Sequence, residues 1–523
     1  MIISMRYLAI LVCIILGLSL VFNSCTKITY SSNSSEVLDF SKDTIHFDSV
    51  FTTIGSVMQY FTVINPHSDA LLIDEISLEK GVNSQFRINI DGQAIIVSDS
   101  NKLTTIEDVT ILPGDSMFVF VEVTVDPTND ISPFLVEDNI RFKSHDNSVD
   151  QVVKLLAYGR NAYFHYQDGN WFNYNENLDN ILSPNEYWTN DLPHVVYGQL
   201  RVMPGNSLTI EAGSEVYVHD GSGIWVQGGT LNIEGTLNNK VVIQGDRMDG
   251  NYPNEAGQWG LEFPLEFEHE GEFVYFTANR GGIWFDRAMN CNVNHAIIKN
   301  GTAGFWVDSV ADGADYALNI TNTEISNMTT IGMVSQGGHI KGVNNLFTDC
   351  GEACGAFSLG GDIVMHLSTF ANYWASGGVR QGPSVYVNDW YESSGGEVYR
   401  PFSVTTEFKN CIIWGNNASL EDHDELVANL RYPNDYTSPL FTACALDVQD
   451  EDFPLNILSD DCTKDTEPPF VNTTLRDFHL SNNSSLWEGI SSVPPFSISE
   501  VSTDLDGIPR SIDYPDRGCY ERN

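Results

Sequence analysis

The chain has 523 residues, of which 26 are Lys or Arg and 70 are Asp or Glu, so its formal net charge at neutral pH is -44. Such an excess of acid repels nucleic acid, anionic lipid and polyanionic glycans unless a cation bridges the two. We therefore expect no nucleic-acid partner, and Ca²⁺ is the one cofactor that this many carboxylates suggest. The length allows two or three domains with a large core.

The chain begins with an apolar run over residues 7–22, preceded by a single Arg6. This run is shorter than the roughly 20 residues of a membrane-spanning helix, so it predicts a cleaved export signal, with an uncleaved membrane anchor as the alternative. Ser24 followed by Cys25 resembles the lipobox of bacterial lipoproteins, although Phe22 and Asn23 depart from its usual Leu and small residue. The resemblance implies a signal over residues 1–24, acylation of Cys25, and a place in the outer membrane or at the cell surface.

Residues 25–37 read as a polar tether, because they contain a Ser- and Asn-rich run. From 38 to 160 about seven short alternating strands are separated by turn signals, which predicts a β-sandwich. The run 111–116, the strand that ends at Asp126-Pro127 and the strand 152–160 resemble the immunoglobulin-like modules of bacterial surface proteins. A spacer role is the default for such a module, and a binding role is the alternative.

Residues 161–195 are rich in aromatic side chains among Asn and Asp. We interpret this segment as a connector that covers the first coil of a repeat domain, whose sheet edge would otherwise be exposed.

A short pattern that begins with Gly recurs along the next part of the chain, mostly at steps of 22 to 28 residues: it starts at Gly223, Gly260, Gly282, Gly304, Gly332 and Gly355. The period is too short for a pair of helices and fits one coil of three short strands. We therefore predict an all-β chain in which a right-handed parallel β-helix of about ten rungs, residues 196–500, follows the sandwich. No rung buries its apolar side alone, so neighbours stabilise one another.

Two stretches resemble bacterial β-helix proteins of the pectin-lyase-like class. The run 208–216 is similar to their opening coils, and the segments 504–510 and 516–521 are similar to their terminal segment. The resemblance implies that residues 501–523 cover the last rung. It carries no defined activity, because the paired-Asp and Gly-His-Gly signatures of β-helix polygalacturonases are missing.

If the residues one and three places after each repeated Gly fill the core, the residue between them faces outward. This rule predicts an outward column of Trp225, Glu262, Trp284, Trp306, Val334 and Phe357. Exposed indole faces suit the C–H surfaces of sugars. The alternative is that another part of the chain covers the column.

Asp286 and Asp308 follow the repeat in the same register, so their carboxylates are expected about 5 Å apart on adjacent rungs. Such a pair could bind Ca²⁺ or serve a retaining glycosidase, and it could also cap turn amides. Lys341 is the third weak catalytic candidate, because enzymes of the resembled class commonly use a Lys or Arg base. The excursion 375–401 adds Trp390 and Tyr391 as ligand-binding candidates.

Seven cysteines follow Cys25. We expect Cys291 and Cys411 to be core residues, and pairing between Cys350 and Cys354 or between Cys444 and Cys462 stays open.

The sequence thus favours a lipid-anchored surface protein that binds glycans or a partner through the flank of the β-helix without catalysis. The alternative is a carbohydrate-active enzyme, either a polysaccharide lyase or a glycoside hydrolase.

Overall fold

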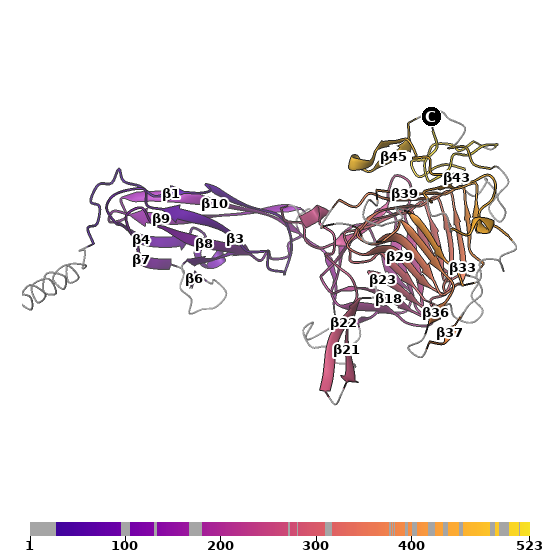
Figure 1. The fold of residues 1–523 in the computed structure, drawn as a ribbon. Coiled ribbons are helices and arrows are strands. Elements are labelled where there is room, and N and C mark those ends of the chain that lie inside the picture. Colours follow the sequence, from indigo (N-terminus) through magenta and orange to yellow (C-terminus); the bar gives the residue numbers. More distant parts are fainter. Residues whose placement is uncertain are drawn as a thin grey trace, which may run out of the picture. The chain divides into compact units, whose positions relative to one another are not determined.

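The computed structural model describes residues 28–90, 92–95, 105–129, 133–166, 180–250, 252–269, 272–279, 281–308, 316–375, 378, 380, 382–392, 396–399, 405–416, 424–431, 438–448, 453–481, 487–490, 502–511 and 513–522. The chain divides into two compact units, residues 1–161 and 162–523 (Figure 1). The predicted signal and Cys25 lie outside the described residues. In the described part, no helix is long and apolar enough to cross a membrane.

The first unit is a β-sandwich of two five-stranded sheets that enclose one apolar core. Sheet A has the order β1 (Asp39–Phe40), β3 (Gln59–Ile64), β8 (Ser116–Val123), β5 (Phe86–Ile90), β6 (Gln93–Ile95). Sheet B has the order β2 (Thr44–Phe51), β10 (Val149–Arg160), β9 (Phe134–Ser144), β4 (Leu71–Leu78), β7 (Thr105–Ile111). A short 3-10 helix, η1 (Gly81–Asn83), joins β4 to β5. The seven predicted strands are all present, and β1, β6 and β7 are additional.

The second unit is a parallel β-helix of three sheets, which confirms the predicted fold class. Sheet I consists of β12 (Asn180–Ile181), β15 (Gln199–Val202), β18 (Gly223–Gln227), β23 (Ile283–Asp286), β26 (Phe305–Val307), β29 (Ile331–Gln336), β32 (Ala353–Ser358), β35 (Val385–Asn388) and β40 (Leu426–Asn429). Sheet II consists of β13 (Glu186–Trp188), β16 (Ser207–Glu211), β19 (Thr230–Glu234), β24 (Cys291–Asn294), β27 (Leu318–Thr321), β30 (His339–Val343), β33 (Asp362–His366), β38 (Glu407–Lys409) and β41 (Phe441–Thr442).

Sheet III consists of β11 (Tyr163–His165), β14 (His194–Val196), β17 (Glu215–Val218), β20 (Val241–Gly245), β25 (Ala296–Lys299), β28 (Glu324–Met328), β31 (Leu346–Cys350), β34 (Thr369–Asn372), β39 (Ile412–Gly415), β42 (Ala445–Leu446) and β43 (Thr463–Lys464). Three antiparallel hairpins project from or accompany the solenoid: β21 (Glu262–His269) with β22 (Glu272–Asn279), β36 (Tyr391–Glu392) with β37 (Val398–Tyr399), and β44 (Phe470–Asn472) with β45 (Asp477–Leu480). Short 3-10 helices are η2 (Tyr252–Asn254), η4 (Leu455–Ile457) and η5 (Thr473–Leu475).

The repeated glycines of sheet I are required by close approach between rungs. A Cβ on Gly304 would lie 2.3 Å from the carbonyl oxygen of Gly332, and one on Gly332 would lie 2.6 Å from that of Cys354. Real Cβ contacts are longer than this, so a larger residue would push the rungs apart.

Asparagines form several of the turns between the strands of the solenoid. Asn300, Asn327, Asn322 and Asn344 all have positive φ angles between 50° and 67°. The Asn327 amide donates to Asn300 Oδ1 at 2.8 Å, and the Asn344 amide donates to Asn322 Oδ1 at 2.6 Å. Stacked amides of this kind satisfy one another from rung to rung.

The connector 161–195 differs from its prediction as a cover. Its described residues supply β11–β14, the first strands of the three sheets. At this end of the core the Trp188 ring stacks against both His165, with ring centroids 4.1 Å apart, and His194, at 4.6 Å. The core therefore ends in rings that belong to the first strands themselves.

The C-terminal segment also differs from its prediction. Residues 502–511 and 513–522 include the side chains that lie against the outer face of sheet III, where Cys519 packs with Leu346 and Ala371. The opposite end of the core is closed instead by Phe453 and Ile457, which belong to the main apolar cluster. The physical reason is that outer positions of sheet III are apolar here and need a cover of their own.

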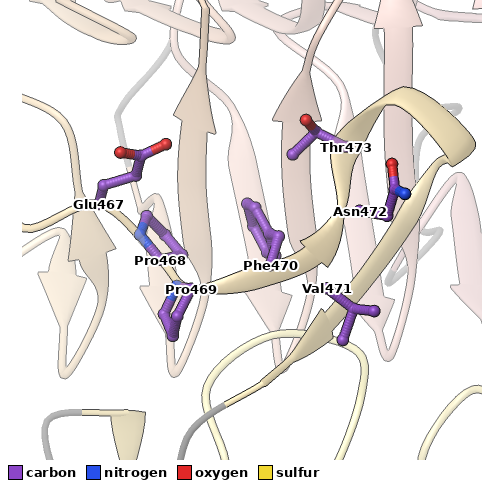
Figure 2. A pocket seen from close by; sticks show the side chains of 7 residues that line it. All are labelled: Glu467, Pro468, Pro469, Phe470, Val471, Asn472 and Thr473. Atoms are coloured by element: carbon purple, nitrogen blue, oxygen red, sulfur yellow. The ribbon is translucent and has the colours of Figure 1, made fainter.

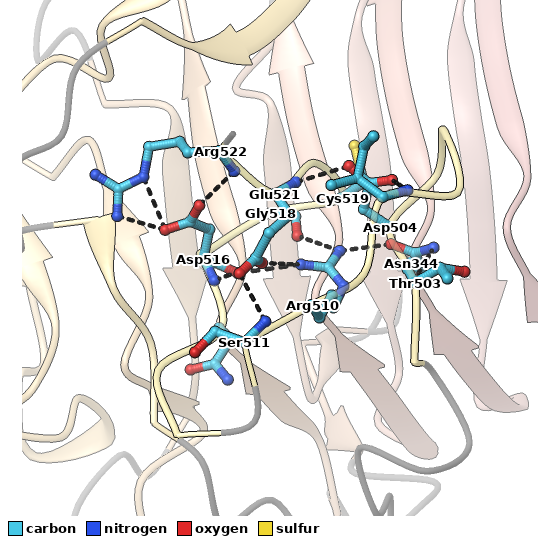
Figure 3. Close-up of polar contacts among 12 residues, drawn as sticks. Asn344, Thr503, Asp504, Arg510, Ser511, Asp516, Gly518, Cys519, Glu521 and Arg522 are labelled. Atoms are coloured by element: carbon cyan, nitrogen blue, oxygen red, sulfur yellow. Dashed lines mark hydrogen bonds and ion pairs between the residues drawn. The ribbon is translucent and has the colours of Figure 1, made fainter.

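Buried Arg510 fastens this segment to the solenoid (Figure 3). Its guanidinium donates to Asn344 Oδ1 at 2.6 Å, to the Gly518 carbonyl oxygen at 3.0 Å and to Glu521 Oε2 at 3.2 Å. A buried charge is tolerated when it is paired and hydrogen-bonded in this way.

The seven described cysteines are free thiols in this structure. Cys291 and Cys411 are fully buried in the main core, as predicted, and so are Cys350, Cys354 and Cys444.

Candidate functional site

The outer face of sheet I collects most of the residues that the sequence singles out. Trp225 pairs with Trp284, and Trp284 pairs with Trp306, in one register across β18, β23 and β26. Their neighbours Ile224, Ile283 and Phe305 point into the core and are fully buried. All three indoles are half-buried on the outer side of the sheet.

Trp225 and Trp284 stack and form a ladder with Trp306, which differs from the predicted platform of exposed indole faces. The ring centroids of Trp225 and Trp284 are 4.6 Å apart with an interplanar angle of 14°. The Arg201 guanidinium lies 4.4 Å from the Trp225 ring centroid. Because these rings cover one another's faces, the ladder between Arg201 and Trp284 offers ring edges to a ligand.

Asp308 ties two rungs of the ladder together. Its carboxylate accepts a hydrogen bond from the Trp284 indole nitrogen at 2.8 Å and another from the Trp306 indole nitrogen at 3.0 Å. Both oxygens therefore serve the ladder. Asp308 follows Val307 in the chain, and Val307 pairs with Phe285, so Asp308 stands beside Asp286 in the sheet.

Asp286 is held by a different partner. Arg287 donates from Nε to one carboxylate oxygen at 2.9 Å and from a terminal nitrogen to the other at 3.1 Å. The hydrogen bond with Asp286 raises the pKa of Arg287 above its ordinary value. Neither carboxylate of the pair is left as an unengaged acid or nucleophile.

Lys341 lies on another sheet. It belongs to β30 of sheet II and pairs in register with Asn319 and Val364. The three weak catalytic candidates Asp286, Asp308 and Lys341 are therefore not assembled on one face. Within the described part of the chain, no group of three or more His, Cys, Asp or Glu side chains is arranged to hold a metal ion.

Two members of the predicted outward column, Glu262 and Phe357, do not belong to it. Gly260 precedes the hairpin β21–β22 and does not start a rung, because β18 pairs directly with β23. Phe357 is buried in the core, because Ala356, not Phe357, pairs with Val334. Gly355 takes the core position, and a Cβ there would lie 2.8 Å from the Phe357 ring.

A second aromatic group lies on the same face, three rungs beyond Trp306. Tyr386 continues the column, since it pairs with Ala356 in β32 and with Val427 in β40. Asn429 connects this end: its amide nitrogen donates to the Tyr386 hydroxyl at 3.1 Å, and its amide oxygen accepts from the Trp390 indole nitrogen at 3.2 Å. The Arg431 guanidinium lies 5.3 Å from the Trp390 ring centroid.

Asn429 and Arg431 were not predicted from the sequence. They could be located from the register of the column, because Tyr386 pairs with Val427 of β40, and Asn429 and Arg431 follow Val427 in the chain. Tyr391 is exposed and stacks on Tyr399, with ring centroids 5.1 Å apart, in the hairpin β36–β37.

Small side chains separate the two aromatic groups. Val334, which is only 5% exposed, and the partly exposed Ala356 occupy the column between Trp306 and Tyr386. Gln336 and Ser358 pair with each other in the neighbouring outward column. A short apolar stretch with amide and hydroxyl groups beside it thus lies between larger aromatic residues.

Two hairpins are inserted next to strands of sheet I, one before the strand β23 and the other after the strand β35. The hairpin β21–β22 is inserted between β20 of sheet III and β23 of sheet I. The hairpin β36–β37 is inserted between β35 of sheet I and β38 of sheet II, and Figure 1 shows both hairpins extending beyond the coils. Long insertions on one flank of a solenoid are typical of a binding face.

One pocket of about 490 Å³ lies at the start of the hairpin β44–β45, lined by residues 467–473 (Figure 2). It contains the carboxylate of Glu467 and the ring of Phe470 between two prolines and polar residues. None of the residues predicted from the sequence lines it, so it is separate from the face of sheet I.

No family model and no curated protein matches this chain. Solved structures that match include a family 123 glycoside hydrolase from Clostridium perfringens, with 9% identity over 23% of this chain and 25% of that chain and a TM-score of 0.15. The present chain thus spans about a quarter of that protein's length. Another is the catalytic unit of a GH87 α-1,3-glucanase from Streptomyces thermodiastaticus strain HF3-3, with 11% identity over 74% of this chain and 72% of that chain and a TM-score of 0.28.

Proposed function

We propose that the protein binds a polysaccharide on the outer face of sheet I, without catalysis. One observation supports this most directly: Trp306 and Tyr386 stand at the two ends of a short row of small side chains on a single face, with amides beside it. Aromatic residues give large rigid contact area, and a few polar groups fix orientation, which is the chemistry of sugar recognition.

The spacing of the rungs suits several linked sugars. Trp306 lies on β26 and Tyr386 on β35, and two strands, β29 and β32, separate them in sheet I. Three steps of about 4.8 Å make about 14 Å between the two aromatic residues. In this proposal the glycan chain runs across the rungs and contacts Ala356, Gln336 and Ser358 on the way.

The charge of the molecule favours a neutral glycan. An acidic polymer would meet a net charge of -44 and would need Ca²⁺ as a bridge. A neutral polysaccharide meets no such barrier, so its retention is expected to be insensitive to chelation of Ca²⁺.

The competing proposal is a carbohydrate-active enzyme on the same flank. It requires a base, an acid and a charge stabiliser that converge within a few ångströms. Asp286 and Asp308 are each bound through both oxygens to neighbouring side chains, and Lys341 is on sheet II. This arrangement supports the binding proposal over catalysis by these three residues.

The test incubates the protein, with and without Ca²⁺, with a panel of neutral and acidic polysaccharides, and measures both retention and release of reducing or unsaturated ends. We expect retention of a neutral polymer without product. The double variant Trp306→Ala/Tyr386→Ala should weaken retention at least about tenfold, because loss of two central aromatic contacts costs at least about 1.4 kcal/mol.

Tyr187→Ala is the matched control, because Tyr187 is an exposed aromatic residue of sheet II. Release of new chain ends would overturn the noncatalytic proposal in favour of the enzyme. Equal retention of the double variant and the control would remove sheet I as the binding face.

We further infer that the protein is exported and held at the membrane by acylated Cys25. The support is the sequence alone: an apolar run followed by Ser24-Cys25 and a polar tether. In the expressing bacterium, Cys25→Ser is expected to move the protein from the membrane fraction to the soluble exported fraction. An unchanged membrane fraction that keeps the uncleaved N-terminus would favour the membrane-anchor alternative.

A further inference from the structure

The sandwich carries an aromatic patch on the outer face of sheet A, formed by Tyr60 of β3 with Phe118 and Phe120 of β8. Tyr60 is 55% exposed and Phe118 is 50% exposed, and the adjacent Met58 is 56% exposed. Single exposed apolar residues are ordinary, but contiguous ones mark a contact surface.

The three rings are neighbours. Tyr60 pairs with Phe120 across the antiparallel strands, and Phe118 is two residues away on the same side of β8. The ring centroids of Tyr60 lie 5.8 Å from Phe118 and 6.1 Å from Phe120. The two phenylalanine rings have centroids 6.2 Å apart and an interplanar angle of 24°, so their faces point in nearly the same direction.

The core of the sandwich does not need these rings. The alternate residues Phe61, Val119 and Val121 point inward and are buried at 1% exposure or less. Period-2 alternation places Tyr60, Phe118 and Phe120 on the solvent side, where a polar residue would be expected in a spacer domain. These aromatic residues therefore expose apolar surface to water, and the stability of the sandwich does not require them.

Polar groups border the patch. Asn89 of β5 pairs with Phe120 in register, and Arg87 of the same strand forms an ion pair with Glu122 at 2.7 Å. The Lys42 ammonium lies 5.9 Å from the centroid of the Tyr60 ring. Rings with amide, guanidinium and ammonium donors at their edges match a ligand with apolar C–H faces and many hydroxyl groups.

Charge decides between the possible occupants. A second copy of this chain carries the same net charge of -44, and an anionic membrane is also repelled. At the patch itself the Lys42 ammonium lies over the Tyr60 ring, and the Arg87 guanidinium is paired with Glu122. An uncharged, hydroxyl-rich partner meets no repulsion from the rest of the molecule.

We propose that the outer face of sheet A is a second carbohydrate site, for a neutral polysaccharide, which works independently of the solenoid. Tyr60, Phe118 and Phe120 give the contact area, and Asn89 and Lys42 give hydrogen bonds to sugar hydroxyls. Two sites on one chain raise the apparent affinity for a polymer by avidity, since the second binding step becomes intramolecular.

The test uses the whole mature chain and insoluble cellulose, xylan and chitin as probes. The variant Tyr60→Ala/Phe118→Ala is expected to lower retention on at least one of them at least fivefold. The matched control is Leu135→Ala/Val152→Ala, which removes two apolar residues of 50% and 43% exposure from the outer face of sheet B. This control is expected to bind like the parent chain.

Both variants should keep the parent's thermal unfolding midpoint, because the changed residues are exposed. Sedimentation velocity of the parent and the variant, without polysaccharide, tests the second copy as occupant. A smaller sedimentation coefficient in the variant, or equal retention of variant and parent on all three probes, would overturn the proposal.

Failure here is distinguishable from failure of the proposal for sheet I. The Trp306→Ala/Tyr386→Ala variant measures the solenoid alone, and the Tyr60→Ala/Phe118→Ala variant measures the sandwich alone. Combining all four changes should abolish the retention that either pair leaves.

Discussion

At the scale of single residues, Asp308 connects the indoles of two rungs. Asp308→Ala would leave two half-buried indole N–H groups without their acceptor, so we expect the free energy of unfolding to fall by about 1–3 kcal/mol. Denaturant unfolding followed by tryptophan fluorescence measures this.

The matched control is Asp286→Ala, one rung away in the same register. It removes an ion pair with Arg287, a largely exposed partner, so the expected loss is below about 1 kcal/mol. Equal effects of the two substitutions would show that the bond to the indoles is not what stabilises the ladder.

His165 makes the first rungs sensitive to acid. Burial, and then the nearby His194, lower its pKa from 6.5 to about 3. A histidine whose pKa is lower in the folded state contributes its full stability above about pH 6.5 and loses it as the pH falls. At pH 5 the expected loss is about 1–2 kcal/mol.

His165→Phe keeps a ring against Trp188 and should flatten this pH dependence between pH 7 and 5. Tyr187→Phe, at an exposed ring of β13 that does not titrate in this range, is the control and should keep the slope of the parent chain. The test is the unfolding midpoint measured across this pH range. If the midpoint of His165→Phe falls with pH as steeply as that of the parent chain, His165 is not the source of the acid sensitivity.

At the scale of elements, two buried cations hold the C-terminal segment to the solenoid: Arg510, which donates to Asn344, and Arg517, which donates to the carbonyl oxygens of Cys444 and Asp461. Arg510→Ala leaves Glu521 without its buried partner, so we expect a loss of about 3–5 kcal/mol and release of residues 502–522 to protease. Limited proteolysis with mass spectrometry locates the first cleavage.

The double variant Arg510→Ala/Glu521→Ala removes both charges and should recover part of that loss, because no unpaired charge stays buried. Cleavage that begins elsewhere in the chain, with this segment still protected, would show that other contacts hold it.

The sequence predicted the solenoid because glycines recur at the spacing of one rung. It predicted the sandwich from strands of alternating polar and apolar residues and from the turn residues between them. It misplaced Gly260 because the five residues after it imitate a rung while they enter a hairpin. It misplaced Phe357 because Gly355 serves as a core position that makes room for large rings, so the count shifts by one.

The sequence contains a signal that one strand of sheet III is covered on its outer face. Ile412, Ile413 and Trp414 are all buried, and such an unbroken apolar run indicates a strand covered on both faces. What no local pattern contains is the identity of the cover, because Cys519 and Leu346 meet only after the chain has folded back over many residues.

For the candidate site, the register of Trp225, Trp284 and Trp306 followed from the repeat. The stacking of the rings and the bonds to Asp308 did not, because side-chain conformation on an outer face depends on the neighbouring rungs. The sequence analysis did not identify Asn429 and Arg431, because the long excursion before them interrupts the spacing by which the next rung could be recognised.

At the scale of the whole molecule, a strongly acidic chain presents two aromatic surfaces on two folded units. The solenoid face and the sandwich face differ in construction: one is a ladder of ring edges with aromatic ends, and the other is a cluster of exposed rings. Both have the aromatic contact area and the polar borders that our two proposals for a neutral polysaccharide require.

Hydroxyl-radical footprinting of aromatic side chains tests the central claim most directly, with and without a neutral polysaccharide that the protein retains. The account predicts lower oxidation of Trp306, Tyr386 and Trp390 in the complex, and unchanged oxidation of exposed Tyr187 on sheet II. Protection of Tyr187 with no change at the three residues of sheet I would contradict it.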